Sequence, residues 1–440
     1  MAWQYEWPPC IYCSGASEMS RNLLLKNLKD PSGKPLELAI ANSRFITVKE
    51  AAPDSEIIDG KGLTAIPGLV DLHTHLREPG KEDAETVLSG SRAAVAGGFT
   101  AISAMPNTNP IADTAGVVEQ VFRLGISHGI CDVFPIGAVT LGQQGKILSE
   151  MGAMRSSEAK VRIFSDDGHC VWDSLVMRRA LEYVKAFDGV IAQHAQDPRL
   201  TQGSQMNEGE VSAALGLKGW PAAAEESIIA RDLLLNEHVG SRLHICHLTT
   251  AGGVELIRWA KNRGIQVTAE VTPHHLLLTD DLARSYDPVY KVNPPLRTER
   301  DVMALREGVV DGTIDVIATD HAPHPAEDKD CEWAAAAFGM IGLETALSVS
   351  YKALVESGLM KFEDLVERMS GAPARIGRYE GHGSLAIGNE ANFTLVDTAA
   401  NWRVETPEIR SKSKNSPYLG LELPVTVRRT YLRGKEVFSQ

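Results

Sequence analysis

The stretch Pro67-Gly-Leu-Val-Asp-Leu-His-Thr-His-Leu-Arg-Glu78 carries most of the information in this chain. Residues 66–72 form a mostly apolar run of strand length, so His73 and His75 lie where a buried strand ends. Side chains two residues apart on an extended chain point the same way, and the two imidazoles can therefore bind one metal ion. Arg77 follows on the same side. Alone, a His-x-His pair is a weak signal, and its value depends on other ligand-type residues at strand ends.

The composition excludes several classes of protein. The 440 residues suffice for one large barrel plus a smaller domain. A formal net charge of −13, with no basic tract to offset it, argues against nucleic-acid and anionic-membrane partners. No apolar run approaches the roughly 20 residues that a membrane span needs. We therefore expect a globular protein that acts on a small molecule.

The six cysteines favour a reduced, cytoplasmic protein over one with a disulfide framework. Cys10 and Cys13 form a C-x-x-C motif, but no second pair exists for a zinc knuckle, and the prolines at 8 and 9 do not fit a redox motif. Residues 1–18 lack the basic start and apolar core of a signal peptide. We expect them to be either a disordered extension or the result of an upstream start, because Met19 directly precedes the first expected strand.

Residues 67–383 alternate short apolar strands with amphipathic helices. A helix over 84–96 ends at Gly97-Gly98 and a strand over 99–105 follows, and comparable units recur further along the chain. Repeated βα units over about 300 residues favour a closed (β/α)8 TIM-type barrel over an open doubly wound sheet. No Gly-x-Gly-x-x-Gly follows a strand, which weakens a nucleotide-binding interpretation.

The two ends of the chain differ from this pattern. Residues 19–66 and 384–440 contain strand-like runs separated by turn residues, and neither end alone could bury a sheet face. Together they are expected to form one small composite β domain. The polar, turn-rich segment 412–420 is most simply a loop.

Further ligand-type residues follow other expected strands. They are Asp166 and Asp167 after 161–164, His194 after 190–193, His247 after 242–246 and Asp320 after 314–319. Barrel enzymes place catalytic groups at the carboxyl ends of their strands, so these side chains are expected to meet His73 and His75. An isolated Asp-Asp-Gly would be interpreted as a turn, and a lone histidine as a core residue. Their recurrence at strand ends favours a metal site, and imidazole with carboxylate suits zinc.

This ligand set predicts hydrolytic chemistry. About six side chains can hold two ions that share a bridging carboxylate and leave a position for a bridging hydroxide. Two cations lower the pKa of that water, which makes a nucleophile at neutral pH. Asp320 is the natural general acid/base, because it can take the proton and pass it to a leaving nitrogen.

Other polar groups concern the substrate. Arg77 suits a bidentate contact with a carboxylate. Asn107 follows another strand, and Asn293 and His324 add donors nearby. Backbone N–H groups of Phe338-Gly339 could complete the pocket.

These motifs together resemble a known family. Residues 67–80, 105–108, 164–168, 270–275, 292–297 and 317–324 (the last reading Ile-Ala-Thr-Asp-His-Ala-Pro-His) closely resemble type I bacterial dihydroorotases of the amidohydrolase superfamily. The resemblance extends from about residue 20 to the end of the chain. It implies a distorted zinc-dependent barrel with a small β domain built from both termini. It also implies reversible interconversion of N-carbamoyl-L-aspartate and L-dihydroorotate in pyrimidine biosynthesis.

The resemblance also implies ligand roles. A first zinc would be bound by His73, His75 and Asp320, and a second by His194 and His247. Two zinc ions per subunit are thus expected.

The resemblance aligns Asp167 with the bridging carboxylate that type I enzymes use where hydantoinases, allantoinases and some other dihydroorotases have a carbamylated lysine, and Asp166 is the alternative. The substrate-contacting positions of the family are matched by Arg77, Asn107, Asn293, His324, Phe338 and Gly339.

Two other functions compete with this one. A hydantoinase or dihydropyrimidinase would have a lysine at the bridging position and no need for Arg77. A non-catalytic dihydroorotase-like partner of aspartate transcarbamoylase would have lost metal ligands, whereas all six are present here. We also expect a homo-oligomer.

Overall fold

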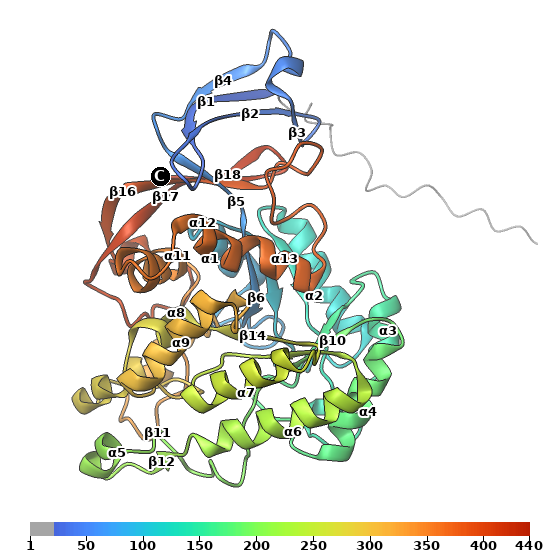
Figure 1. Cartoon of the computed structure of the whole chain (residues 1–440), viewed down its shortest axis with the longest axis vertical. Helices are drawn as coiled ribbons and strands as arrows, with labels where there is room; N and C mark the ends of the chain where they lie inside the picture. Colours follow the sequence, from blue (N-terminus) through green and yellow to red (C-terminus); the bar gives the residue numbers. More distant parts are fainter. Residues whose placement is uncertain (1–21) are drawn as a thin grey trace, which may run out of the picture.

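The computed structural model describes residues 22–440, and Figure 1 shows the chain as two connected parts. The strands of the two chain ends, coloured blue and red, lie together at the top, with the barrel below them. The expectation of a disordered extension over residues 1–18, and the motif of Cys10 and Cys13, fall outside the described residues.

Eight parallel strands within residues 22–440 form the barrel. Three of them pair in the order β6 (Leu69–Thr74), β7 (Phe99–Ala104) and β8 (Asp132–Pro135). The other five pair in the order β15 (Val316–Ile317), β14 (Val267–Val271), β13 (Arg242–Ile245), β10 (Val190–Gln193) and β9 (Ile163–Phe164). Parallel bridges between Gly137 and Phe164 and between Thr74 and His321 join the two groups at both edges. The barrel is therefore closed, and the predicted (β/α)8 fold is confirmed.

Helices cover the outside of the barrel (Figure 1). The longer ones are α1 (Val87–Ala96), α2 (Ala115–His128), α4 (Ser174–Lys185), α6 (Ala223–Val239), α7 (Ala251–Asn262) and α9 (Glu299–Asp311). Shorter ones are α3 (Met151–Ser156), α5 (Glu210–Leu215), α8 (Pro273–Leu277), α10 (Ala326–Lys329), α11 (Ala346–Ser350), α12 (Phe362–Val366) and α13 (Ala372–Gly377). The π-helical turns η6 (Tyr351–Glu356) and η7 (Glu367–Gly371) continue α11 and α12, and β11 (Met206–Asn207) pairs with β12 (Gly219–Trp220) beside α5.

Local sequence signals begin and end these helices. Helix α1 starts at Val87, three residues later than expected, because the Thr86 side chain accepts a hydrogen bond from the Ser89 backbone N–H. Helix α4 begins at Ser174 in the same way, because the Asp173 side chain accepts hydrogen bonds from the backbone N–H groups of Leu175 and Val176. Gly129 ends α2 with φ of 62°, a conformation that costs glycine little.

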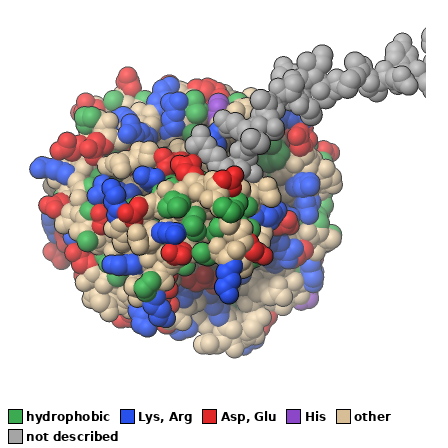
Figure 2. Space-filling view, turned by 90° about the horizontal axis from the view of Figure 1, so that it is seen from above, with side chains coloured by type: hydrophobic (Ala, Val, Ile, Leu, Met, Phe, Trp, Pro, Cys, Tyr) green, Lys and Arg blue, Asp and Glu red, His purple; other side chains and the backbone are tan. Residues whose placement is uncertain are grey.

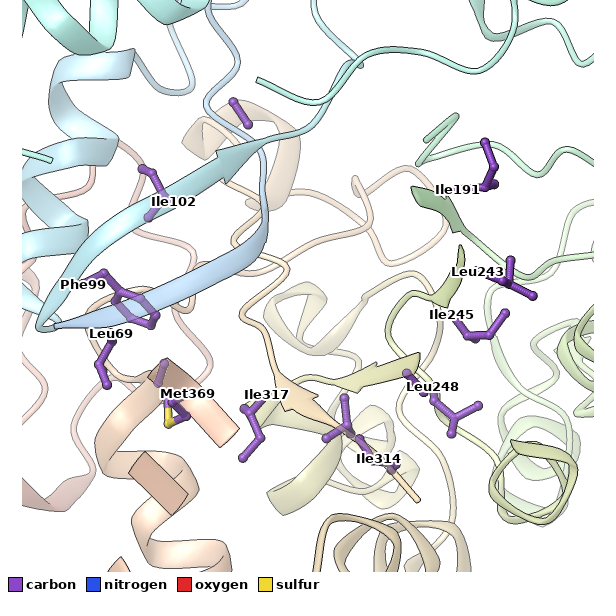
Figure 3. Packing of buried hydrophobic residues seen from close by; sticks show 14 of the residues in the cluster. Leu69, Phe99, Ile102, Ile191, Leu243, Ile245, Leu248, Ile314, Ile317 and Met369 are labelled. Atoms are coloured by element: carbon purple, nitrogen blue, oxygen red, sulfur yellow. The ribbon is translucent and has the colours of Figure 1, made fainter. Parts of the chain in front are cut away.

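Alternating side chains on each strand separate two apolar layers. On β10, Val190 and Ala192 face the barrel interior, whereas Ile191 packs toward the helices. Figure 3 shows the outer layer, in which Ile191, Leu243 and Ile245 lie on neighbouring strands. The same alternation carries His194, two residues beyond Ala192, to the inner face of the barrel.

The terminal strands form one sheet beside the barrel. Its order is β18 (Lys435–Ser439), β17 (Glu422–Leu432), β16 (Phe393–Arg403), β5 (Thr64–Pro67), β1 (Leu23–Lys29), β2 (Pro35–Ala41) and β3 (Arg44–Ile46), with β4 (Glu56–Asp59) paired to β1. The two chain ends meet where β5 runs antiparallel to β16. The expectation that both termini build one β sheet is confirmed, and the domain limits at 66/67 and 383/384 stay a prediction.

The apolar run of residues 66–72 is divided between the two sheets. Strand β5 ends at Pro67 and β6 begins at Leu69, so Ile66 belongs to the terminal sheet. Gly68 lies at the division, where an added Cβ would lie 2.3 Å from Thr100 Oγ1. The expectation of one continuous strand over residues 66–72 is therefore wrong. The chain passes from one sheet to the other at Gly68, where only glycine allows so close an approach to the neighbouring strand.

No helix within residues 22–440 is long and apolar enough to cross a membrane. Seen from above in Figure 2, basic and acidic side chains are intermixed on that face. The cysteines at 131, 170, 246 and 331 are free.

Candidate active site

The structure brings the predicted metal ligands together at the carboxyl ends of the barrel strands. All of them are buried: His73, His75, Asp167, His194, His247 and Asp320. Among these six residues, two groups of three have ligand atoms within 4.8 Å of one another, namely His73 with His75 and Asp320, and His73 with Asp167 and His247. A third group in the described part of the chain combines His73 with Cys246 and Glu270. The sixth residue, His194, contacts this cluster through Asp167 and His247.

Asp167 lies between two pairs of imidazoles. Its Oδ2 atom is 3.4 Å from His73 Nε2 and 3.3 Å from His75 Nε2. Its Oδ1 atom is 3.2 Å from His194 Nδ1 and 3.3 Å from His247 Nε2. Each carboxylate oxygen therefore faces a different histidine pair, which is the arrangement that a bridging ligand requires.

The neighbouring Asp166 points elsewhere. Its Oδ1 accepts hydrogen bonds from the backbone N–H groups of Val139 at 2.8 Å and Thr140 at 3.0 Å. The Thr140 hydroxyl donates to its other oxygen. Asp166 thus holds the loop after β8, and of the two carboxylates only Asp167 reaches the cluster.

Three residues of the site have backbone conformations that non-glycine residues rarely adopt. They are Arg77 with φ of 63°, His247 with φ of 31° and Asp320 with φ of 47°. Leu243 and Ile245 of β13 face the helices, so regular alternation would turn residue 247 outward as well. The positive φ of His247 breaks this alternation and accompanies its contact with Asp167. Such strain is typical of functional sites.

Neighbouring side chains fix which nitrogen of each imidazole is free. His73 Nδ1 is 2.6 Å from Glu270 Oε1, and His75 Nδ1 is 2.9 Å from Asn107 Oδ1. Because these oxygens can only accept, both Nδ1 atoms carry the hydrogen and both Nε2 atoms are left for the cluster.

His194 has the opposite tautomer. Its Nε2 lies 2.7 Å from Gln196 Oε1 and donates there, which leaves Nδ1 toward Asp167 and His247. The buried Nε2 of His73 has no hydrogen-bond partner within residues 22–440. A bare nitrogen facing carboxylates needs a cation between them, so the donor set fits a metal ion.

Sequence reasoning missed Glu270 and Gln196 as orienting residues. Glu270 contacts His73 with one oxygen and His244 Nε2, at 3.0 Å, with the other. His244 Nδ1 also lies 2.8 Å from Thr268 Oγ1, so both ring nitrogens of His244 have partners. Gln196 lies two residues after His194 and could have been found from that spacing. The partner of Glu270 is 197 positions away, and no local signal reveals it.

Electrostatics favour ionised carboxylates at the centre of the site. Burial opposes ionisation of Asp167, but the positive charge of a protonated His73 and hydrogen bonds from His194 and His247 outweigh it and hold its pKa well below the ordinary value. With the imidazoles neutral, a metal cation would supply the same positive charge. For Asp320, burial is likewise outweighed by His73 and His75, and its pKa is lowered. Both groups are therefore anionic and suited to cations.

Arg77 lies beside the cluster with an unpaired charge. Its Nε donates to the Pro323 carbonyl at 3.1 Å, and no carboxylate pairs with it in the described part of the chain. Only 7% of Arg77 is exposed, and burial lowers its pKa to about 10, so it stays a cation at neutral pH. A buried cation without a partner can bind an anionic group of a substrate.

The remaining predicted substrate residues surround this cation and the cluster. Arg77 Nη2 is 3.4 Å from His324 Nε2, which donates to the Phe338 carbonyl at 2.9 Å. An added Cβ at Gly339 would lie 2.8 Å from His324 Nε2, so these residues are in close contact. Burial and the charge of Arg77 lower the pKa of His324 to about 3, which keeps its ring neutral.

The two asparagines connect the substrate side to the ligands. Asn107 contacts His75, as described above, and Asn293 Nδ2 is 3.5 Å from the same Gln196 oxygen that accepts from His194. The Oδ1 atom of Asn293 is buried without a hydrogen-bond partner within residues 22–440 and remains available to a ligand. All six predicted substrate residues thus lie in one connected region.

Comparison with solved structures defines the class of protein. The chain matches an L-hydantoinase (dihydropyrimidinase) from Arthrobacter aurescens with a TM-score of 0.84, 27% identity and coverage of 95% of this chain and 96% of that one. A D-hydantoinase structure matches with a TM-score of 0.81 at 22% identity, covering 95% of each chain, which shows the fold alone. This fold, with its buried His/Asp cluster at the strand ends, places the chain in the amidohydrolase superfamily.

Sequence relatives define the family more narrowly. A family model described as "Dihydro-orotase-like" matches residues 62–252. The dihydroorotase of Streptomyces coelicolor is 63% identical over 94% of this chain and 97% of its own length. The dihydroorotase of Mycobacterium tuberculosis is 53% identical over 88% of this chain and 90% of its own length. The chain is an enzyme of the dihydroorotase family.

Glu270 offers a test of the cluster that does not depend on turnover. We expect Glu270→Ala to weaken Zn²⁺ binding by about 10–100-fold, because an orienting partner of a ligand histidine typically contributes that much. Titration of the metal-free protein with zinc measures this affinity. Asp132→Ala is the matched control, since Asp132 also holds a histidine, His382, but lies at the start of β8. Equal zinc affinity of both variants would show that Glu270 does not act on the cluster.

Proposed function

We propose that this enzyme catalyses the reversible cyclisation of N-carbamoyl-L-aspartate to L-dihydroorotate in the synthesis of UMP. The observation that carries the proposal is Asp167, whose two oxygens face separate histidine pairs, next to the unpaired cation of Arg77. The first feature is suited to two cations and the second to a carboxylated substrate. The names of the sequence relatives support the same reaction.

Two zinc ions are the proposed cofactors. His73, His75 and Asp320 would hold the first ion, His194 and His247 the second, and Asp167 would bridge them. When bound, zinc supplies a Lewis acid that polarises the substrate carbonyl and makes water more acidic.

Asp320 is the proposed general acid/base. Its Oδ1 lies 3.0 Å from His75 Nε2 and 3.4 Å from His73 Nε2, inside the cluster and close to where water would attack. In hydrolysis, it takes the proton of the attacking water as the new C–O bond forms. It then gives that proton to the ring nitrogen as the C–N bond breaks. Cyclisation follows the same path in reverse.

The substrate is positioned by its carboxylate. The guanidinium of Arg77 would bind this carboxylate through two charge-assisted hydrogen bonds, with Asn107 and His324 as neighbouring polar contacts. Asn293 and the backbone at Phe338-Gly339 would contact the ring. These residues line one region of the site. The predicted metal ligands are more deeply buried and would hold the ions.

Hydantoinase activity is the main alternative, because the solved structures described above carry that name. Such an enzyme would be expected to have a lysine where Asp167 stands, and it would have no carboxylate for Arg77 to bind. Both residues favour the dihydroorotase proposal.

A non-catalytic role beside aspartate transcarbamoylase is disfavoured because every predicted ligand is present. Assembly into a homo-oligomer, association with a transcarbamoylase and a cytoplasmic location remain proposals.

The role of Asp320 can be separated from metal binding. Asp320→Asn keeps an oxygen for the metal but cannot carry a proton, so we expect kcat to fall by ~10²–10⁴-fold with much of the metal retained. Metal analysis and steady-state kinetics on the same preparation provide the test. A loss below about tenfold, with chemistry rate-limiting, lies outside this range and would remove the assignment.

Arg77 should decide the substrate class. Arg77→Lys keeps the charge but loses the fork geometry, so it should weaken use of dihydroorotate, and Arg77→Ala should nearly abolish it while zinc stays bound. Dihydrouracil, which has no carboxylate, serves as the control substrate. Dihydrouracil should be a poor substrate for the wild type, and the variants should hydrolyse it no more slowly than the wild type does. Efficient hydrolysis of dihydrouracil by the wild type, or a harmless Arg77→Ala, would favour the hydantoinase function instead.

A further inference from the structure

A segment of the C-terminal part of the chain is built into the active-site region. Residues 410–416 lie between strands β16 and β17 of the terminal sheet and overlap the loop expected over residues 412–420. Its side chains alternate: Ser411, Ser413 and Asn415 are buried, whereas Lys412 and Lys414 are exposed. One face of this extended segment therefore packs against the barrel.

Its first half contacts the buried carboxylate of Glu85. The Ser411 hydroxyl and the Lys412 backbone N–H both donate to Glu85, the latter at 3.1 Å. Glu85 Oε2, which accepts from Ser411, also lies 3.3 Å from His321 Nε2. His321 directly follows Asp320, so the segment is connected to the loop that carries the proposed general base.

Asn415 connects two loops of the substrate region. Its Oδ1 accepts from the His324 backbone N–H at 3.2 Å. Its Nδ2 donates to the carbonyls of Ala322 at 3.0 Å and Gly339 at 3.2 Å. The backbone carbonyl of Asn415 accepts from the Ile341 N–H at 3.2 Å. One side chain thus makes three hydrogen bonds to the backbone on both sides of the His324–Gly339 contact.

The contact that Asn415 spans leaves little room for movement. An added Cβ at Gly339 would lie 2.8 Å from both Ala322 Cβ and His324 Nε2, so the two loops are packed against each other. A carboxylate at position 415 could not donate to the two carbonyls, and serine is too short to span both loops. An asparagine meets all three hydrogen-bonding needs.

We infer that Asn415 is a positioning residue that shapes the substrate pocket by holding the His324 loop against Gly339. This inference rests on the proposed function, which places both of these residues around the substrate. Asn415 contacts none of the predicted metal ligands in the described part of the chain, so its effect falls on binding of the substrate. Residues 410–416 thereby make the terminal sheet region a contributor to specificity.

The test compares Asn415→Ala with Asn392→Ala in the full-length, zinc-loaded enzyme. Asn392 is the matched control: it is buried and also joins two backbone groups, through bonds of 2.9 Å to the Gly381 carbonyl and 2.7 Å from the Arg433 N–H, but within the terminal sheet region. We expect Asn415→Ala to raise KM for dihydroorotate about tenfold, as loss of positioning hydrogen bonds would, with kcat nearly unchanged. Zinc content should equal that of the wild type. Asn392→Ala should lower Tm and leave KM unchanged.

Asn415→Ser is a second, milder variant that keeps the inference testable if the alanine variant folds poorly. Its hydroxyl can satisfy part of the network, so KM should lie between those of wild type and Asn415→Ala. The inference is overturned if the 415 variants change only Tm, as Asn392→Ala does, or if they lower kcat with KM unchanged. Failure of the proposed function is a separate result, because wild-type enzyme would then not turn over dihydroorotate at all.

Discussion

An ionised carboxylate at the centre of a protein is stable only where cations or hydrogen bonds compensate its charge, and Asp167 is such a group. Its two oxygens face separate histidine pairs, so the strands that carry those histidines must all end around one point. Closure of the barrel through the bridge between Thr74 and His321 brings two of these histidines, His73 in β6 and His75 directly after it, next to Asp320. The barrel and the charged centre thus depend on each other.

Three of the predicted ligand histidines are oriented by hydrogen bonds to neighbouring side chains, and the three neighbours are of different residue types. Glu270 orients His73, Asn107 orients His75 and Gln196 orients His194. The carboxylate strengthens its histidine as a donor, whereas the two amides also lie close to the substrate region. In the proposed function, Asn107 would thus contribute to metal binding through His75 and to substrate binding directly, whereas Gln196 would act through His194 and Asn293.

The barrel and most of the candidate site could be predicted from the sequence, because the carboxyl ends of parallel strands converge and ligand-type residues recur there. The positions of His73, His75 and Asp320 follow from that rule alone. The choice between Asp166 and Asp167 could not be predicted in this way, because it depends on contacts of Asp166 with a loop 26 positions away in the sequence. The left-handed backbone of His247 leaves no sequence signal, and Asn415 lay in a segment whose polar composition resembled an ordinary surface loop.

The most direct test of this account is diffraction from crystals of the zinc-loaded enzyme, recorded on both sides of the zinc absorption edge. The account predicts two anomalous peaks per chain, one beside His73, His75 and Asp320 and one beside His194 and His247, with Asp167 between them. A single peak, or a pair in which Asp167 contacts only one ion, would contradict the central role given to this carboxylate.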